Sequence, residues 1–216
     1  MLKADLHIHT QYSMDCATPL EAIIKRCQAL GINCIAIADH GTTEGAFKMQ
    51  AIAPFKVIIA EEMITPHGEI MGMFLKEEIP SHLSVEETIA RIRDQDALVC
   101  IPHPFDKIRH SALDDDTLEQ IVEEIDVLEV FNSKVIFPRT LARARLFAAK
   151  YSLPQSAGSD AHSIYEVGNA YVEMPEFSDK DDFLQALAQG KIYGRRTNPL
   201  ARFASAWTKL KKGLKA

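Results

Sequence analysis

The sequence of 216 residues has few cysteines and no long apolar run. None of its four cysteines forms a C-x-x-C pair, so the sequence predicts neither a zinc site built from thiolates nor a disulfide-linked secreted fold. No stretch approaches the ~18 consecutive apolar residues of a membrane span, and charges interrupt the first residues where a signal peptide needs an apolar core. These absences predict a cytoplasmic protein whose cysteines are reduced and buried (Cys16, Cys27, Cys34 and Cys100).

Negative charge is missing from the last part of the chain, although the whole chain has a formal net charge of −6. Residues 195–216 contain seven Lys or Arg residues and no Asp or Glu. We expect residues 1–196 to form one folded domain and residues 197–216 to form a basic, helical tail. Such a tail either binds an anionic partner, such as nucleic acid or lipid headgroups, or only keeps the chain soluble.

Hydrophobic residues make up 47% of the chain, enough for one buried core, and they follow two alternating patterns. Apolar, β-branched runs predict strands at 2–9, 34–39, 56–63, 69–75, 97–102, 127–132, 153–159 and 169–174. Helical periodicity predicts helices at 18–30, 84–95, 138–151 and 179–190, with Thr18 and Ser84 as N-caps. This alternation predicts an α/β fold, either a barrel or a doubly wound sheet.

Histidines and carboxylates recur at the ends of the predicted strands. They are His7, His9, Asp39, His40, Glu61, Glu62, His103, Asp160 and His162. Barrels place their chemistry at the C-terminal ends of the strands, so these side chains are expected to converge. Imidazole and carboxylate ligands suit Zn²⁺, Mn²⁺ or Fe²⁺. Because one ion cannot use so many ligands, we expect two or three divalent ions with a bridging carboxylate, an arrangement suited to phosphoester hydrolysis.

Five segments carry a family resemblance. "DLHIHT", "IADHG", "IIAEEM", "IPHPFD" and "GSDAHS", in this order, resemble the motifs of the polymerase and histidinol phosphatase (PHP) family. The resemblance extends from Ala4 to about Arg196, and the chain looks like the short stand-alone members. It implies a distorted (β/α)7 TIM-like barrel with a trinuclear metal centre at the C-terminal ends of the strands.

The resemblance also implies a ligand for each ion. His7, His9 and Asp160 match the ligands of one ion, and His103 matches a ligand of the second. Asp15, His40 and His162 match the set of the third. Glu62, rather than Glu61, matches the bridging glutamate, and residues 58, 60 and 62 share one face of their strand. A metal-bound hydroxide held by His7, His9, Glu62 and Asp160 is then the expected nucleophile.

One family ligand has no counterpart at its usual place. Many members carry a histidine in the strand that here reads "GEIMGMFL", where this chain has Met71. His67, just before this strand, is a candidate substitute, and an ordinary exposed turn histidine is the alternative. Without a substitute, the second ion would be held by Glu62, His103 and water.

Several further residues are candidates for binding the substrate or orienting a ligand. Arg109, Lys134 and Arg139 are candidates for a substrate phosphate, with solvated loop charges as the alternative. Asn132 is a candidate to hydrogen-bond the substrate or a ligand. Asp39 is a candidate to orient a ligand histidine, with a helix N-cap as the equal alternative.

The resemblance implies a hydrolase of the PHP phosphoesterase type. Its expected substrates are nucleotides or short nucleic acids, cleaved by a 5′-to-3′ exonuclease or a nucleotide phosphatase; small phosphomonoesters such as histidinol phosphate are the alternative. The acidic body argues against a long nucleic-acid track. Two rivals are a non-catalytic metal-binding regulatory domain and an amidohydrolase. The latter normally needs a strand-end lysine as a carbamylated bridge, and the predicted strand ends supply none. The sequence does not predict an oligomeric state.

Overall fold

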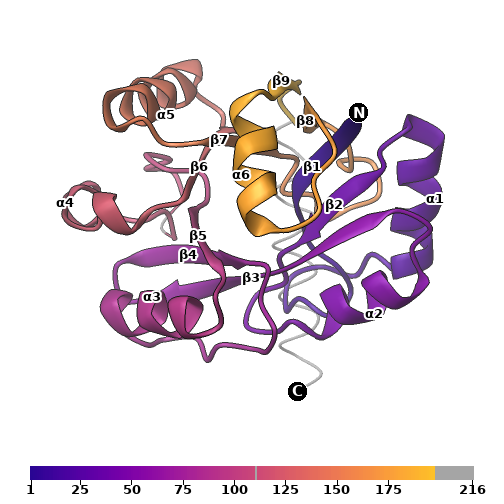
Figure 1. Cartoon of the computed structure of the whole chain (residues 1–216), viewed down its shortest axis with the longest axis horizontal. Coiled ribbons are helices and arrows are strands. Elements are labelled where there is room, and N and C mark those ends of the chain that lie inside the picture. Colours follow the sequence, from indigo (N-terminus) through magenta and orange to yellow (C-terminus); the bar gives the residue numbers. More distant parts are fainter. Residues whose placement is uncertain (110, 198–216) are drawn as a thin grey trace.

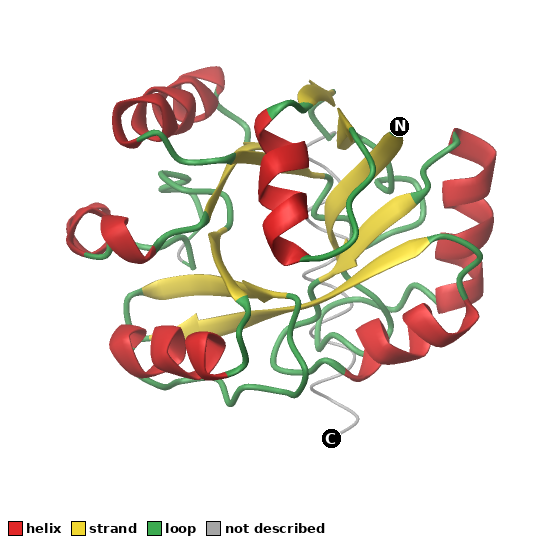
Figure 2. Cartoon of the chain, viewed as in Figure 1, coloured by secondary structure: helices red, strands yellow, loops and turns green. Residues whose placement is uncertain are grey.

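The computed structural model describes residues 1–109 and 111–197, so positions 198–216 of the predicted basic tail lie outside the described residues. Helices surround the strands, as the alternating sequence pattern predicts (Figures 1 and 2). No helix within the described ranges has both the length and the apolar character needed to cross a membrane. The elements in chain order are β1 (Leu2–Ile8), α1 (Leu20–Leu30), β2 (Cys34–Ile37), α2 (Glu44–Ile52), β3 (Lys56–Thr65), β4 (Gly68–Met73), α3 (Val85–Asp94), β5 (Leu98–Ile101), α4 (Asp115–Gln120), a 3-10 turn (Val122–Glu124), β6 (Val127–Asn132), α5 (Pro138–Tyr151), β7 (Gln155–Gly158), β8 (Ala170–Met174), α6 (Lys180–Ala188) and β9 (Lys191–Gly194).

The strands form one sheet in the order β7-β6-β5-β4-β3-β2-β1-β8-β9. Neighbours are parallel from β1 to β3 and from β5 to β7, whereas β4 is antiparallel to both β3 and β5. β1 also meets β7, because His7 O accepts a hydrogen bond from Asp160 N at 2.7 Å and Ile8 bridges Ala161 in parallel. The sheet therefore curls into a nearly closed barrel of β1 to β7, and β8 pairs with the start of β1.

The predicted TIM-like barrel is confirmed, but the count of seven strand–helix units is not. Pro66 and His67 alone join β3 to β4, so these strands form an antiparallel hairpin with no helix between them. Gly68 begins β4 with a φ of 132°, a conformation open mainly to glycine. A Cβ atom there would lie 2.4 Å from the Cα atom of Leu113, so the hairpin also depends on close packing.

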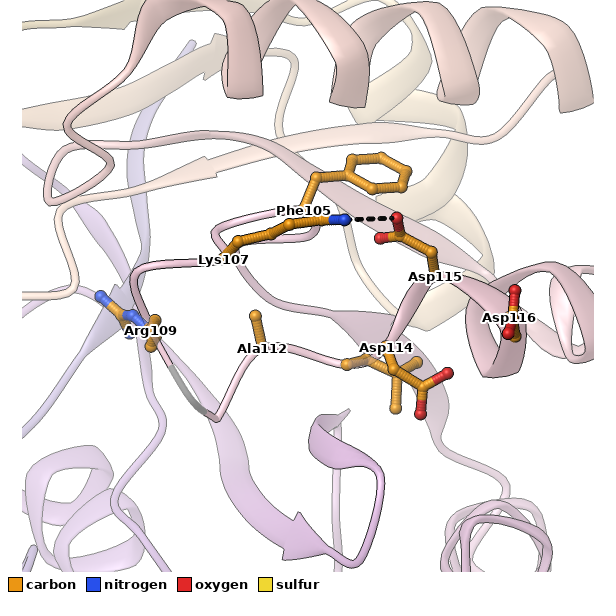
Figure 3. Close-up of a pocket in the computed structure, with 8 residues that line it drawn as sticks. Phe105, Lys107, Arg109, Ala112, Asp114, Asp115 and Asp116 are labelled. Carbon is orange, nitrogen blue, oxygen red and sulfur yellow. Dashed lines mark ion pairs between the residues drawn. The ribbon is translucent and has the colours of Figure 1, made fainter.

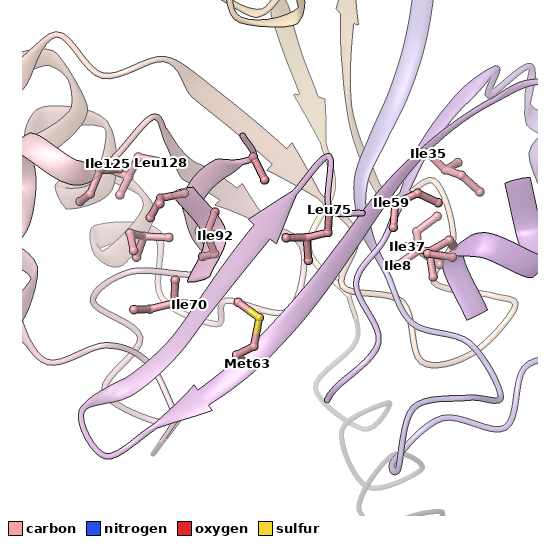
Figure 4. Close-up of a cluster of buried hydrophobic side chains, with 14 of the residues drawn as sticks. Ile8, Ile35, Ile37, Ile59, Met63, Ile70, Leu75, Ile92, Ile125 and Leu128 are labelled. Atoms are coloured by element: carbon pink, nitrogen blue, oxygen red, sulfur yellow. The ribbon is translucent and has the colours of Figure 1, made fainter. Parts of the chain in front are cut away.

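Alternation along the strands sorts the apolar side chains into two cores. In β2, Ala36 belongs to the cluster inside the barrel, while Ile35 and Ile37 belong to the cluster between the sheet and the outer helices. Figure 4 shows part of this outer cluster, including Ile8 and Ile59 close to both isoleucines of β2. In β2 the inward side chains are small and the outward ones large, which suits a narrow barrel filled by its own residues.

Helix α6 closes one end of the barrel. Its Phe183 and Leu187 are buried in the interior cluster with Leu2 and Leu98, the first residues of β1 and β5. In Figure 1, α6 accordingly lies across the strands rather than beside them. Since α6 covers the end where the parallel strands begin, their C-terminal ends are left for polar side chains.

The two N-cap predictions have different outcomes. Ser84 caps α3 as predicted, since its side chain accepts a hydrogen bond from Glu87 N. The prediction for Thr18 is wrong: α1 begins at Leu20 after Pro19, and the Thr18 hydroxyl donates to His162 O at 3.2 Å. Thr18 therefore supports the loop after β7 instead of a helix end.

Candidate metal centre

The histidine pair of β1 faces the middle of β3. His7 Nε2 lies 3.1 Å from His9 Nε2. Glu62 Oε2 lies 3.4 Å from His7 Nε2 and 3.3 Å from His9 Nε2. All three side chains are buried, and their nearest ligand atoms lie within 4.8 Å of one another, close enough to share an ion. The strand alternation that favours Glu62 over Glu61 agrees with this placement, because the Glu61 carboxylate instead accepts a hydrogen bond from Ile79 N outside the barrel.

A second group forms where the loops after β1, β2 and β7 meet. Asp15 Oδ2 lies 2.9 Å from His162 Nε2 and 3.5 Å from His40 Nε2. With His9 added, these ligand atoms also lie within 4.8 Å of one another. The four residues come from positions up to 153 apart in the chain, and only the barrel brings them together.

A third group contains Glu69, a residue that the sequence reading missed. Glu69 Oε1 lies 3.9 Å from His40 Nδ1, and Glu69 Oε2 lies 3.4 Å from His103 Nε2. His103 Nε2 is also 2.9 Å from Glu62 Oε1. Glu69, His40 and Glu62 form a group of possible ligands. The missed signal was the alternation in β4, which puts Glu69 on the same face as Met71 at the end of the strand nearest the other ligands.

His67 is not brought into these groups. Its side chain is 57% exposed, and its Nδ1 lies 2.9 Å from Asp114 Oδ2 on the outside of the turn. Met71, at the place of the absent family histidine, is buried in the apolar interior. Glu69 rather than His67 is thus the additional ligand candidate that this part of the chain contributes.

Asp160 lies against two cations and a histidine. Its Oδ2 lies 2.6 Å from Arg109 Nη2, and its Oδ1 lies 3.4 Å from Lys134 Nζ and 3.6 Å from His9 Nε2. Burial alone would raise the pKa of Asp160, but Arg109 and Lys134 hold it well below its usual range. Asn132 Nδ2 also donates to Asp160 Oδ2 at 3.2 Å. The predicted substrate cations therefore lie against a predicted metal ligand.

The prediction that no strand end supplies a lysine is wrong. Lys134 follows β6 by two residues, and its buried Nζ lies 2.6 Å from His162 Nδ1. A strand end therefore does supply a lysine. It contacts the carboxylate of Asp160 as a cation, whereas a carbamylated lysine is an anion, and the carboxylate between His7 and His103 is that of Glu62.

Glu129, in the middle of β6, was also missed. Its Oε1 lies 3.1 Å from His7 Nδ1, and its Oε2 accepts hydrogen bonds from His103 N at 2.7 Å and Asn132 Nδ2 at 2.9 Å. A carboxylate on Nδ1 fixes a histidine ring so that Nε2 faces a metal ion. Gly158 makes room for this contact, since a Cβ atom there would lie 2.2 Å from His7 Cβ.

The charges around the site favour a cation at its centre. Burial would raise the pKa of Glu62, yet His7 and His40 hold it well below its ordinary value. Burial would lower the pKa of His7, but Glu62, Glu129 and Asp160 raise it well above the usual range. Burial lowers the pKa of His9, and His162 lowers it further, which favours the neutral form that binds metals.

Several buried atoms of the site have no hydrogen-bond partner among the described residues. They are Glu62 Oε2, Glu69 Oε2, Asp160 Oδ1 and the Nδ1 atoms of His9, His40 and His103. Leaving buried polar atoms unpaired is costly, so such a cluster calls for a ligand. Imidazole nitrogens and carboxylate oxygens are the donors that divalent transition metals accept, so the residues fit metal ions.

The backbone at two of these side chains adopts a sparsely populated conformation. His103 has a φ of 33° and Asp160 a φ of 52°, both in the left-handed region that non-glycine residues rarely adopt. The surrounding contacts hold this strain, since His103 N donates to Glu129 and Asp160 N donates to His7 O. The fold therefore maintains two strained residues at the C-terminal ends of its strands.

Two further candidates from the sequence, Asp39 and Arg139, make contacts outside the three ligand groups. The Asp39 carboxylate accepts hydrogen bonds at 2.6 Å from the backbone N and the hydroxyl of Thr10. The alternative of a helix N-cap is wrong, because Thr43 is the N-cap of α2. Asp39 thus ties the loops after β1 and β2 together. Arg139 is exposed in the first turn of α5, where its guanidinium lies over the ring of Phe137.

Comparison with known proteins identifies a family for this chain. Residues 5–96 match the family model described as PHP domain, and residues 138–192 match the model described as PHP-associated. The chain is 37% identical over 187 residues to the uncharacterized protein MJ0417 of Methanocaldococcus jannaschii. That match covers 85% of this chain and 75% of the relative.

Two solved structures share the fold. One is a two-domain protein from Bacteroides vulgatus that contains a predicted PHP-like metal-dependent phosphoesterase. It matches with a TM-score of 0.71 and 16% identity over 90% of this chain, which spans 65% of that longer protein. The other is PsfC from Pseudomonas syringae, with a TM-score of 0.69, 13% identity, and coverage of 97% of this chain and 98% of that chain.

Proposed function

This chain belongs to the PHP domain family, and from that premise we propose that it is a metal-dependent phosphoesterase acting on nucleotides or short oligonucleotides. The observation that carries the proposal is the overlap of three ligand groups. Glu62 belongs to two of them and contacts His103 as well, while His9 and His40 each belong to two. Adjacent ion sites that share ligands are typical of centres that hydrolyse phosphoesters.

The residues that would hold the ions follow from these groups. They are His7, His9, Asp15, His40, Glu62, Glu69, His103, Asp160 and His162. Divalent ions such as Zn²⁺, Mn²⁺ or Fe²⁺, when bound, would lower the pKa of water and neutralise charge on the phosphoryl oxygens. Further hydrogen bonds orient the ligand residues. Glu129 contacts the His7 ring, and Asn132 donates to the carboxylates of both Glu129 and Asp160.

Arg109 and Lys134 are the proposed binding residues for the substrate phosphate. Arg109 and Lys134 approach Asp160 from different loops, and the Arg109 side chain keeps 18% of its surface exposed. Arginine binds phosphate oxygens in pairs, and lysine adds a point charge. An incoming phosphate can therefore be held and oriented at the edge of the metal ligands without any further charged residue.

A nucleotide or short oligonucleotide fits the charge of the chain better than a long nucleic acid. Residues 1–194 contain 17 Lys and Arg residues against 30 Asp and Glu residues. Tight binding along a nucleic-acid backbone needs many cations, because each neutralised phosphate contributes to the affinity. The local cations at Arg109 and Lys134 support recognition of one phosphate, not of an extended backbone.

The test uses the full chain loaded with Mn²⁺ and a short 5′-phosphorylated RNA, with histidinol phosphate assayed in parallel. Stepwise release of mononucleotides or loss of the 5′-phosphate is the expected result. Intact RNA with phosphate released from histidinol phosphate would overturn the nucleotide part and leave a small-molecule phosphatase. No reaction on either substrate, with fewer than two ions bound per chain, would favour a non-catalytic metal-binding domain.

A further inference from the structure

A pocket of about 490 Å³ lies between the loop after β5 and the first turns of α5. We call it the cationic pocket; it is lined by Phe105, Lys107, Ile108, Phe137, Arg139, Thr140 and Arg143. Three of these side chains are basic, three are large and apolar, and none is acidic. The lining therefore combines positive charge with flat apolar surface.

A neighbouring pocket shows that this combination is local. It shares Phe105 and Lys107 with the cationic pocket but is also lined by three consecutive aspartates, Asp114 to Asp116 (Figure 3). Figure 3 shows Lys107 extending toward Asp115 while Arg109 points away from it. An anionic ligand would be repelled from the aspartate-lined pocket and attracted to the other.

The cationic pocket keeps a surplus of positive charge. Asp115 is shared by Lys107 at 3.3 Å and Arg143 at 3.0 Å, so one carboxylate faces two cations. Arg139 adds a third, and its described contact is with the ring of Phe137, 5.0 Å away. Arg143 similarly lies 4.0 Å from the ring centre of Phe105. Cations beside aromatic rings recur where proteins bind single-stranded nucleic acid.

Both loops that form this pocket also supply the metal centre. His103 and Arg109 lie on the loop that carries Phe105 and Lys107, and Lys134 lies three residues before Phe137. Phe137 is 41% exposed, and Ile108 is 44% exposed. A ligand with its phosphate at Arg109 and Lys134 is thus held by the same two segments that carry this apolar surface and further positive charge.

We propose that the cationic pocket binds the second nucleotide of a short single-stranded oligonucleotide whose terminal phosphate lies at the metal centre. Arg139 contacts the phosphate between the two nucleotides, and the second base lies against Phe137 and Ile108. The inference rests on the proposed phosphoesterase function and narrows its substrate to an oligonucleotide. It also predicts that mononucleotides and small phosphomonoesters are the poorer substrates.

The test compares two substrates of the Mn²⁺-loaded full chain, a 5′-phosphorylated deoxyadenylate trimer and p-nitrophenyl phosphate. We expect Arg139→Ala to lower the ratio of the two kcat/KM values, trimer over p-nitrophenyl phosphate, by about tenfold. Phe137→Ala should lower the same ratio by about tenfold through lost stacking. Arg145→Ala is the matched control, because Arg145 is exposed on the same helix but lines a different pocket. It should leave the ratio unchanged.

A binding measurement separates this inference from the proposed function. Fluorescence anisotropy measures binding of the labelled trimer after the metal has been removed by a chelator. Arg139→Ala should bind the trimer more weakly than the wild type, and its slope of log affinity against log salt concentration should be smaller by about 1. If the wild type hydrolyses neither substrate but this difference persists, the proposed function fails and the pocket assignment stands. If hydrolysis is normal but Arg139→Ala binds the trimer as tightly as the wild type, the pocket assignment is wrong. It is also wrong if Arg145→Ala loses as much affinity as Arg139→Ala.

Discussion

The two ends of the barrel are built from the same strands but have opposite chemistry. At the end where the parallel strands begin, Leu2 and Leu98 pack against Phe183 of α6 in an apolar cluster. At the other end, carboxylates and imidazoles face one another, and several of their buried atoms have no hydrogen-bond partner in the described chain. The first end stabilises the fold by burial, whereas the second holds buried polar groups whose chemistry fits metal ions.

Single strands show how this difference arises. In β3, Ile58 and Ala60 belong to the interior apolar cluster, and Glu62, the next residue on that face, belongs to the metal centre. In antiparallel β4 the order is reversed, since Glu69 comes first and Met71 follows toward the apolar end. The face of a strand thus decides whether a residue points inward, and its position along the barrel axis decides which chemistry it meets.

The largest effect is expected from Glu62→Gln. Losing the charge of the shared carboxylate should lower phosphoesterase activity on the order of 10³-fold and release bound metal, because both groups that contain Glu62 lose an anionic ligand. Activity assays and metal content by mass spectrometry measure this. Glu61→Gln is the matched control: burial raises the pKa of Glu61 to about 8, so an amide resembles its protonated form. Equal losses in both variants would contradict the assignment of Glu62.

Phe183→Ala tests the opposite end. Phe183 is fully buried, so we expect the variant to lose about 3–5 kcal/mol of unfolding free energy in urea denaturation. Variants that remain folded should bind as much metal as the wild type, since the cavity lies at the far end of the barrel. A loss below about 1 kcal/mol would show that α6 is not needed to close the apolar end.

Glu69→Gln tests the ligand that the sequence did not predict. We expect metal affinity to fall about 10–100-fold, with weaker retention of one ion and a smaller loss of activity than for Glu62→Gln. Titration calorimetry with Mn²⁺ measures the number of sites and their affinities. Unchanged titrations would remove Glu69 from the ligand set and leave His40 and Glu62 without this partner.

Glu129→Gln tests whether metal binding depends on the hydrogen bonds that orient the ligand residues. The amide keeps the shape of the side chain but cannot accept hydrogen bonds at both ends from His7, His103 and Asn132. Metal affinity should therefore fall about tenfold with the fold retained, as judged by circular dichroism. Wild-type affinity in this variant would show that the His7 ring is held without Glu129.

His67→Ala should have the smallest effect. The histidine is exposed and pairs with Asp114 on the surface, so stability should change by less than about 1 kcal/mol. Metal content and activity should match those of the wild type. Loss of one ion from this variant would instead make His67 the substitute for the absent family histidine. His67, not Glu69, would then be the additional ligand from this part of the chain.

Local sequence was sufficient wherever a ligand belongs to a short motif. The pair His7 and His9 is separated by one residue, so alternation alone predicted a shared face, and the structure places both Nε2 atoms 3.1 Å apart. The choice of Glu62 over Glu61 came from the family resemblance, and alternation agreed with it. The strand-end positions of His103 and Asp160 could be read from their motifs, but their left-handed backbone could not.

Residues whose partners lie far away in the chain could not be predicted in this way. Glu129 meets His7 across 122 positions, and Lys134 meets His162 across 28. Neither stands in a motif that names its role, and lysine and glutamate are usually solvated. For His67 the sequence offered the right residue type near the right strand, but the hairpin turn directs its side chain outward to Asp114.

The sequence by itself determined the α/β alternation and the gathering of histidines and carboxylates at strand ends, because these depend on periodicity and spacing along a strand. The TIM-like barrel, rather than a doubly wound sheet, was expected only from the family resemblance. Only the tertiary structure decided that Glu69 rather than His67 faces the ligands, that Glu129 supports His7, and that Arg139 lines a separate cationic pocket. Those outcomes depend on which strands become neighbours and on where each loop crosses the end of the barrel. That information arises only when the sheet closes, since closure sets the distances between residues remote in sequence.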